Sequence, residues 1–390
     1  MHTPHYAALT HVLPWLGIPL GLCAIAYAYL SLWACVVHAR TIKHPQVDVN
    51  DWASQPVSVL KPLHGMEPDL YENLRSFCEQ AYAIYELLCG VRESDDPAVA
   101  VVKRLQQEFP QRTITLVVDS QVHGANPKVS NLINLLAHAN HDWLVLADSD
   151  IRVPSDYLGR VCVPLQDEGI GIVTCLYHGL ATEQPIARMG RLFIDDWFAP
   201  SVRLAHAFGS THFAFGSTIA MRRETLRRMG GFEALRDTLA DDFWLGELSR
   251  RLGLRTVLSD VEVGTTISER DLGSLWRREL RWLRTIRAIS PMGFFFSFIC
   301  FTWPLLLLVC VLEPTEIGLL AVLCGGVARV LRYVVSWRDT ARSSPWRDIW
   351  LTPFRDVLLL VEWAGALVHW RVHWRDHVLH ARDHTPSRYS

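Results

Sequence analysis

The first 39 residues contain no Lys, Arg, Asp or Glu, and within them Leu13 to Val37 is a nearly continuous apolar run. About 20 apolar residues are enough for a helix to cross the hydrocarbon core of a bilayer. A cleaved signal peptide is the alternative, but no basic stretch precedes this run, and the run is longer than the roughly 7–15 residues of a signal-peptide core. The pattern therefore predicts a transmembrane anchor over residues 1–40.

Long apolar runs return in the last quarter of the chain. Ile289 to Leu312 carries no charge and predicts a second span, and Ile317 to Trp337 predicts a third. The third run contains Arg329 and Arg332, which share one helix face because they are three residues apart. Their long side chains are expected to reach the membrane interface.

The last apolar run, Val357 to Trp370, is short and is interrupted by Glu362. It either completes a span that begins near Ile349 or lies partly in the interface, so the topology of the C-terminus stays open. Together these runs predict transmembrane or interfacial helices over 288–375, followed by a basic tail over 376–390.

Basic residues fix the expected orientation. Arg40 and Lys43 directly follow the first apolar run. By the positive-inside rule the N-terminus then lies outside and the bulk of the chain lies in the cytosol. The net charge of −2 shows no basic excess of the kind that nucleic-acid binding requires.

Residues 55–287 alternate strand-like and helical patterns, which predicts an α/β fold with a mainly parallel, doubly wound sheet. The strand-like runs are Val57–Leu60, Tyr85–Val91, Thr113–Val118 and Trp143–Ala147, and the helical patterns are Leu70–Ala81, Val99–Phe109 and Val129–Ala139. Ligands of such sheets bind beyond the carboxyl ends of the strands. No glycine-rich dinucleotide or P-loop motif follows any strand, which argues against dehydrogenases and P-loop enzymes.

Acidic residues follow the predicted strands. Asp148 and Asp150 come directly after the apolar run that ends at Ala147. Two carboxylates two residues apart can present oxygen ligands to Mg²⁺ or Mn²⁺, and such ions bridge phosphate oxygens. The alternative is a solvated turn, because Asp and Ser favour turns.

Two further acidic pairs lie at predicted helix starts. Asp95 and Asp96 precede Pro97, where an acid caps a helix or accepts hydrogen bonds from a nucleoside. Asp241 and Asp242 open another helical run, where they complement the helix dipole. Alternatively, Asp242 is a general base that takes a proton from an acceptor hydroxyl as the new bond forms.

A basic and aromatic cluster precedes the C-terminal apolar runs. Helical spacing places Arg278, Arg281 and Trp282 on one face. Arginine side chains suit pyrophosphate oxygens, although basic and Trp residues beside a span are also common membrane anchors. Lys128 also has two interpretations: it binds a phosphate group, or it merely lies in the first turn of a helix.

Together these motifs resemble the ceramide glucosyltransferases of glycosyltransferase family 21, and within them the bacterial hopanoid-biosynthesis branch. The likeness covers about residues 10 to 375. The matching stretches, in family order, are Val57–Gly65, Asp95–Ala98, Gly124–Lys128, Asp148–Val153, Ala240–Phe243 and Arg278–Trp282. This chain reads Asp-Ser-Asp at 148–150, where the animal enzymes read Asp-Ser-Gly.

The resemblance implies a GT-A fold, a UDP-sugar donor, a divalent metal (Mg²⁺ or Mn²⁺) and inversion at the anomeric carbon. Carried over by motif, Asp96 resembles the acid at the nucleoside, Asp148 and Asp150 the metal-associated pair, and Asp242 the catalytic base. Lys128 joins the expected donor-binding residues. Arg278, Arg281 and Trp282 resemble the signature that closes on the diphosphate and the sugar.

The resemblance also implies a multi-pass protein of a bacterial inner membrane with a lipid acceptor. The residues around Cys175 and Asp242 are more similar to the hopanoid-type enzymes, which implies transfer of N-acetylglucosamine to a hopanoid polyol. Ceramide glucosylation is the first alternative. A processive polysaccharide synthase shares these motifs but needs more spans for a polymer channel. A scaffold that only binds nucleotide sugar is the non-enzymatic alternative, against which the intact acidic motifs argue.

Overall fold

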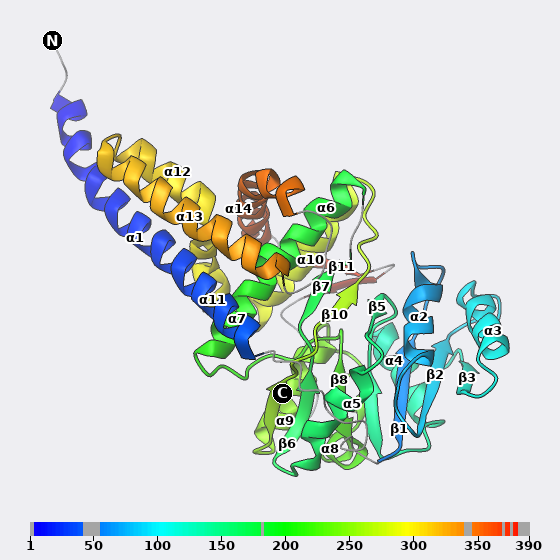
Figure 1. Ribbon diagram of the computed structural model, residues 1–390. Helices are drawn as coiled ribbons and strands as arrows, with labels where there is room; N and C mark the ends of the chain where they lie inside the picture. The colour runs from blue at the N-terminus through cyan, green and yellow to red at the C-terminus, as the bar shows by residue number, and fades with distance from the viewer. Residues whose placement is uncertain are drawn as a thin grey trace. The chain divides into compact units, whose positions relative to one another are not determined.

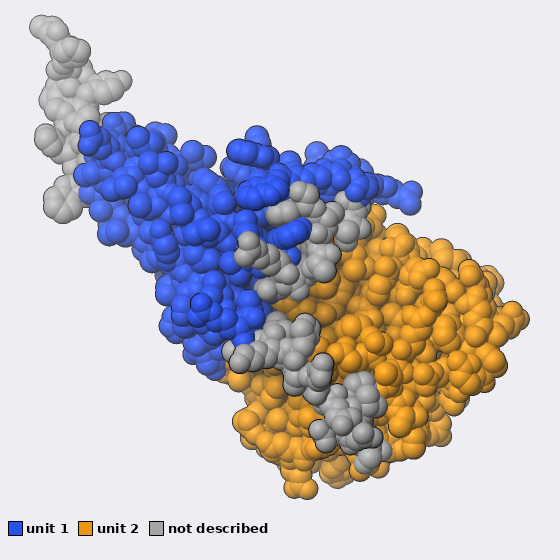
Figure 2. Space-filling view, viewed as in Figure 1, with its two compact units in different colours: residues 1–43, 181–209, 269–382 blue, residues 44–180, 210–268, 383–390 orange. Residues whose placement is uncertain are grey.

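The computed structural model describes residues 4–41, 55–180, 183–338, 345–368, 371–374 and 377–380. The chain divides into two compact units, drawn in different colours in Figure 2. The unit formed by 1–43, 181–209 and 269–382 is called the helical unit below, and the unit formed by 44–180, 210–268 and 383–390 is called the sheet unit. The predicted basic tail over 376–390 lies outside the described residues except for 377–380.

The sheet unit is built on a seven-stranded sheet. In spatial order its strands are β3 (Thr113–Val118), β2 (Tyr85–Val91), β1 (Val57–Pro62), β4 (Trp143–Leu146), β8 (Ile219–Arg222), β6 (Ile170–Thr174) and β9 (Arg255–Leu258). Only β8 runs antiparallel to its neighbours (Figure 1). The predicted α/β fold with a mainly parallel sheet is therefore confirmed.

Side chains alternate between the two faces of this sheet, and helices cover both. Val57 and Val59 belong to the core on one face, with residues of α2, α3 and α5. Leu60 belongs to the core on the other face, with residues of α4, α8 and α9. The helices of this unit are α2 (Leu70–Cys78), α3 (Ala98–Glu108), α4 (Pro127–Leu136), α5 (Tyr157–Cys162), η2 (Val163–Gln166), α8 (Arg223–Met229), η4 (Phe232–Leu235) and α9 (Asp241–Arg251).

A second, three-stranded sheet completes this unit. Its central strand β10 (Val263–Thr265) pairs antiparallel with β5 (Ile151–Arg152) and parallel with β7 (Tyr177–Gly179). Since β5 begins directly after Asp150, this pairing brings β10 beside the acidic residues that follow β4.

The helical unit contains the predicted membrane segments. Its elements are α1 (Pro4–Thr41), α6 (Pro185–Leu192), the π-helix η3 (Phe193–Phe198), α7 (Ala199–Ala207), α10 (Leu272–Ile289), α11 (Pro291–Phe296), η5 (Ser297–Cys300), α12 (Thr302–Leu312), α13 (Glu316–Arg338), η6 (Pro345–Arg347), η7 (Ile349–Leu351), α14 (Thr352–Val368), β11 (Arg371–Trp374) and β12 (His377–His380). Gly17–Arg40 and Glu316–Trp337 are each long and apolar enough to cross a membrane. The first apolar run and the run over Ile317–Trp337 thus form helices of membrane-spanning length.

The predicted span over Ile289–Leu312 is broken in the structure. Helices α11 and α12 are bent by 65° relative to one another, so they count as a third span only if the bent pair crosses as one. The break falls at Phe301, whose ψ of 76° is not helical. Pro304 accounts for it, because a proline cannot donate to the carbonyl four residues earlier and its ring clashes there.

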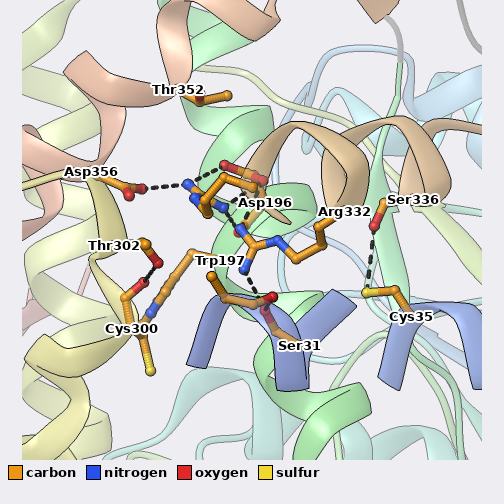
Figure 3. A network of polar contacts seen from close by, with 12 residues as sticks. Ser31, Cys35, Asp196, Trp197, Cys300, Thr302, Arg332, Ser336, Thr352 and Asp356 are labelled. Carbon is orange, nitrogen blue, oxygen red and sulfur yellow. Dashed lines mark hydrogen bonds and ion pairs between the residues drawn. The ribbon is translucent and has the colours of Figure 1, made fainter. Parts of the chain in front are cut away.

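Arg329 and Arg332 do not reach the interface, contrary to expectation. They are 3% and 1% exposed, and both bind the carboxylate of Asp196 in η3, at 2.7 and 2.9 Å. Figure 3 shows Arg332 beside Asp196. Arg329 also pairs with Asp356 of α14 at 2.9 Å, and Arg332 donates to Ser31 Oγ of α1 at 3.2 Å. Acids from other helices supply the partners, so the two cations stay inside the bundle.

Candidate active site

The candidate site lies at the carboxyl edge of the large sheet. Leu60 of β1 pairs with Leu146, the last residue of β4, so both parallel strands reach the same edge of the sheet and Asp148 follows there. Strand β8 runs the other way, and its first residue, Ile219, also pairs with Leu146. The loop before β8 therefore reaches the same edge and brings Gly216 beside Asp148.

Hydrogen bonds hold the two acids of the Asp148-Ser149-Asp150 segment in different surroundings. Asp148 Oδ1 forms an ion pair with Lys128 Nζ at 2.7 Å. Asp150 Oδ2 accepts from Thr265 Oγ1 of β10 at 2.7 Å, and the Asp150 carbonyl accepts from Thr266 N at 3.0 Å. Ser149 Oγ donates to Glu67. The turn after β4 is thus tied to three other segments of the unit.

The electrostatics of this turn favour a bound cation. Burial and the nearby negative charge of Asp148 raise the pKa of Asp150 to about 6, against the Thr265 hydrogen bond, which lowers it. The buried Lys61 side chain donates to the Asp148 carbonyl at 2.5 Å. Burial lowers the pKa of Lys61 to about 8, although Asp150 and Asp148 act in the opposite direction. A divalent ion would relieve the repulsion between the two carboxylates.

The two carboxylates of this turn fit a metal ion whose remaining ligands are waters and substrate oxygens. Among the residues that the structure describes, no group of three or more His, Cys, Asp or Glu side chains could hold a metal ion. Mg²⁺ sites commonly use one or two carboxylates, with waters and substrate phosphates completing the shell. Asp148 and Asp150 match that type of site.

Asp241 and Asp242 begin α9 and have different environments. Asp241 is buried and pairs with Lys128 Nζ at 3.0 Å. Asp242 is half-buried; its Oδ2 accepts from Gly216 N at 3.0 Å and its Oδ1 accepts from Phe243 N at 2.8 Å. Burial and the charge of Asp241 raise the pKa of Asp242 to about 6, while Lys128 lowers it. Such a carboxylate is ionised near neutral pH yet basic enough to take a proton.

Lys128 links the two acidic segments. Burial alone lowers the pKa of Lys128, but Asp148, Asp241 and Asp242 raise it well above its ordinary value, so the ammonium stays charged. The local fold fixes its place at the start of α4. Asn126 caps this helix by accepting from Val129 N at 3.1 Å, and its Nδ2 donates to the Thr238 carbonyl at 2.8 Å. The loop before α4 is thereby fastened to the loop before α9.

Gly216 is a site residue that no sequence pattern indicated. Its carbonyl accepts from Asp148 N at 3.1 Å, and its N–H donates to Asp242, so one residue joins both acidic motifs. A Cβ at this position would lie 2.6 Å from Asp148 Oδ2 and 3.2 Å from Lys128 Nζ. Nothing larger than glycine fits without moving the carboxylate.

Replacing Gly216 with alanine is therefore expected to displace the Asp148 carboxylate and weaken the metal site. We expect the metal concentration for half-maximal turnover to rise about 10- to 100-fold, the range seen when the support of a metal ligand is lost. Metal titrations of purified wild type and Gly216→Ala measure this. Gly169→Ala, where a Cβ would meet the Asp167 carboxylate at 3.1 Å on an exposed turn, is the control. An unchanged metal requirement in Gly216→Ala would refute the role given to this glycine.

Asp96 has a local structural role. Its Oδ2 accepts from Gly65 N at 2.9 Å and its Oδ1 accepts from Ala98 N at 2.8 Å, while Asp95 is exposed. Gly65 has a φ of +70°, which glycine adopts without strain. Asp96 thus ties the loop after β1 to the start of α3, beside the carboxyl edge of the sheet.

The residues Arg278, Arg281 and Trp282 lie on α10 of the helical unit. Arg278 pairs with Glu269 at 2.7 Å and lies over the Trp282 ring at 5.4 Å. Arg281 and Trp282 are half-buried on the same helix. The structure thus brings Lys128, the acid pair after β4 and Asp242 together in the sheet unit, and it places the Arg-Trp signature in the helical unit.

Comparisons with known proteins agree with this architecture. The sequence matches the model of the family described as Glycosyl transferase family 21 over residues 16–386. Ceramide glucosyltransferase 3 of Caenorhabditis elegans is 26% identical over 273 residues, which is 70% of this chain and 59% of the relative. Ceramide glucosyltransferase 1 of the same organism is 25% identical over 236 residues, which is 60% of this chain and 50% of the relative. The chain thus matches about half to three fifths of the length of these relatives.

Among solved structures, a mannosyltransferase from Pyrobaculum calidifontis in complex with GDP-mannose and Mn²⁺ superposes with a TM-score of 0.50. The two proteins are 22% identical, and the match covers 90% of this chain and 99% of the mannosyltransferase. The expected GT-A fold is confirmed.

Proposed function

The chain belongs to glycosyltransferase family 21, and from this premise we propose that it is an inverting membrane glycosyltransferase that moves one sugar from a UDP-sugar to a lipid hydroxyl. One observation carries the proposal. Lys128 bridges Asp148 and Asp241, and Gly216 binds both Asp148 and Asp242. Groups suited to a leaving diphosphate and a group suited to an attacking hydroxyl therefore lie at one edge of the sheet.

The proposed donor site uses the acids after β4. Asp148 and Asp150 would hold Mg²⁺ or Mn²⁺, as the donor set fits and as the P. calidifontis mannosyltransferase was solved with Mn²⁺. When bound, such an ion supplies positive charge for the diphosphate oxygens. Lys128 adds a second cation beside Asp148, and Asp96 is assigned to the nucleoside. Arg278, Arg281 and Trp282 are assigned to the diphosphate and the sugar.

In the proposed transfer step, Asp242 takes the proton from the lipid hydroxyl. The hydroxyl oxygen bonds to the anomeric carbon while the bond from that carbon to the UDP oxygen breaks, and UDP leaves from the opposite face. The configuration at the anomeric carbon inverts because a single displacement occurs. Asp242 is oriented for this role by Gly216 N and Phe243 N, which leave its carboxylate little freedom to rotate.

The proposed acceptor is the terminal hydroxyl of a hopanoid polyol, with N-acetylglucosamine as the sugar. The resemblance of the Asp242 and Cys175 segments to the hopanoid-type enzymes supports this choice. Ceramide is the second candidate acceptor, because the relatives reported above are ceramide glucosyltransferases. Both acceptors present a hydroxyl at the membrane surface, so one mechanism serves either.

The proposed location is a bacterial inner membrane, crossed more than once. Basic residues from Arg40 onward support a cytosolic location for the predicted catalytic domain over residues 55–287. The exposed apolar side chains of α12 and α13, among them Val311 (75% exposed) and Leu320 (60% exposed), would face lipid.

The proposal is tested by measuring UDP release from the purified protein in lipid nanodiscs with Mn²⁺. UDP-N-acetylglucosamine and UDP-glucose are each supplied with a hopanoid polyol, with ceramide and with no added acceptor. We expect release that needs both a donor and an acceptor lipid. Binding of UDP-sugar without release under any combination would instead identify a nucleotide-sugar binding protein and overturn the proposal.

Turnover is expected to fall at acidic pH. The pKa of Asp242 is raised to about 6, and Asp242 acts as a carboxylate, so its function as a base is lost by protonation as the pH drops through about 6. Since kcat/KM reports the free enzyme, it should fall about 10-fold per pH unit below that value. A profile of kcat/KM that stays flat down to pH 5 would contradict this role.

A further inference from the structure

The middle of the Arg-Trp signature contains a buried acid. Glu279 of α10 has no exposed surface, and its carboxylate binds Arg355 Nη2 of α14 at 2.5 Å. The same carboxylate lies 3.3 Å from Arg278 Nη2. Arg355 and Arg278 therefore share one carboxylate, and α14 is linked through Glu279 to the first arginine of the signature.

A second route joins Arg355 to the tryptophan of the signature. The Arg355 guanidinium lies 5.2 Å from the ring centroid of Phe193 in η3. The Phe193 ring meets the Trp282 ring edge-on, with centroids 5.5 Å apart. Arg278 itself lies over Trp282. The contacts therefore run in a closed ring from Arg355 through Glu279, Arg278, Trp282 and Phe193 back to Arg355.

Three carboxylates and two arginines meet in this cluster. Glu279, Glu269 and Glu362 face Arg278 and Arg355, and Glu362 pairs with Arg355 at 3.2 Å. Without Arg355, Glu362 would lose the cation with which it pairs, and Glu279 would keep its contact with Arg278. A buried acid that loses its partner attracts any remaining cation, so Arg278 would be drawn toward Glu279 and away from Glu269 and Trp282.

Asp356, the residue after Arg355, ties α14 to two other helices. Asp356 pairs with Arg329 of α13 at 2.9 Å and accepts from Trp303 N at the start of α12 at 3.1 Å. Consecutive residues of α14 thus reach the signature helix on one side and two apolar helices on the other. Helix α14 is therefore tied both to the bundle and to α10.

We propose that Arg355 and Glu279 are positioning residues of the transfer reaction. Through Arg278 and Phe193 they set the guanidinium and the indole of the signature in the placement that the donor requires. The inference rests on the donor-binding role proposed above for Arg278 and Trp282.

The first test is spectroscopic and needs no turnover. The full chain is labelled with 5-fluorotryptophan in nanodiscs, and the ¹⁹F resonance of Trp282 is assigned by its loss in Trp282→Phe. Arg355→Met is expected to shift or broaden this resonance. Arg160→Met is the control, because it removes a largely buried arginine that also binds two carboxylates, Asp156 and Asp260, within the sheet unit, and it should leave the Trp282 resonance in place.

The second test is kinetic, on the monodisperse fraction of each variant. We expect Arg355→Met to lower kcat about 10- to 100-fold, as displaced positioning groups do, with a smaller change in the KM for the donor. In an Arg278→Met background the same change should add little, because its effect passes through Arg278. Arg355→Lys keeps the charge but loses the bidentate guanidinium, so its loss of kcat should lie between wild type and Arg355→Met. It takes the place of Arg355→Met if that variant does not fold.

The outcomes are distinct. An unmoved Trp282 resonance in a folded Arg355 variant, or additive kinetic losses with Arg278→Met, overturns the inference. A moved resonance together with a wild type that transfers no sugar overturns the proposed function and leaves the positioning of Trp282 standing. A moved resonance with non-additive losses supports both.

Discussion

Replacing Asp242 with asparagine is expected to lower kcat by about 10²- to 10⁴-fold, the usual contribution of a general base. Asparagine has nearly the same shape and its oxygen can still accept from Gly216 N, so the fold and the loop before β8 should persist. It cannot take the proton of the attacking hydroxyl. The KM for the UDP-sugar should change little, because this carboxylate is assigned to the acceptor.

The matched control is Asp142→Asn. Asp142 directly precedes β4, at the end of that strand away from the candidate site, and its side chain is 92% exposed. It should keep wild-type turnover. Initial rates of both variants at saturating donor and acceptor give the comparison, with circular dichroism to verify folding. Retention of more than a few per cent of wild-type kcat in folded Asp242→Asn would remove Asp242 from the mechanism.

Removing the divalent metal is expected to have the second largest effect. Chelation should abolish turnover, and Mn²⁺ or Mg²⁺ should restore it. Asp150→Asn is expected to lower kcat about 10²- to 10³-fold at fixed metal, comparable to the loss of one group that stabilises charge in the transition state. The reason is that Asp148 alone, already paired with Lys128, offers a weaker anionic site than the two acids together.

Calorimetry of UDP binding separates this effect from damage to the fold. Wild type should bind UDP more tightly with Mn²⁺ than with chelator, and Asp150→Asn should lose that difference. Thr265→Val is a milder variant, because it removes only the hydroxyl that donates to Asp150. It should lose part of the difference in UDP affinity between Mn²⁺ and chelator. Full turnover in the presence of excess chelator would contradict a metal-dependent mechanism.

The sequence predicts the sheet well where local patterns decide the structure. The runs Tyr85–Val91 and Thr113–Val118 coincide with β2 and β3, because both are rich in residues that favour strands and both are followed by a charged residue. The placement of the acids after β2 and β4 at one edge follows from the parallel order of those strands. Both features depend on contacts between neighbouring elements of the chain.

The remaining features depend on long-range contacts. Gly216 reaches Asp148 because β8 inserts antiparallel beside β4, and no local pattern around Gly216 signals that pairing. The sequence shows Glu362 only as an interruption of an apolar run, whereas the structure makes it a partner of Arg355. Arg355 and Glu279 are 76 residues apart, and Arg329 and Asp196 are 133 apart. Pairs of this separation are set by tertiary packing.

The most direct test of the central claim, transfer of a single sugar to a membrane lipid, is mass spectrometry of lipids from cells that express the chain with both candidate acceptors. Cells expressing Asp242→Asn are the paired control. The account predicts a lipid carrying one added sugar residue in wild-type cells only. A hopanoid bearing one N-acetylhexosamine would identify the proposed acceptor, and a hexosylceramide would move the assignment to the second candidate. Identical lipid profiles in the two cultures, or a polymeric product, would contradict the account.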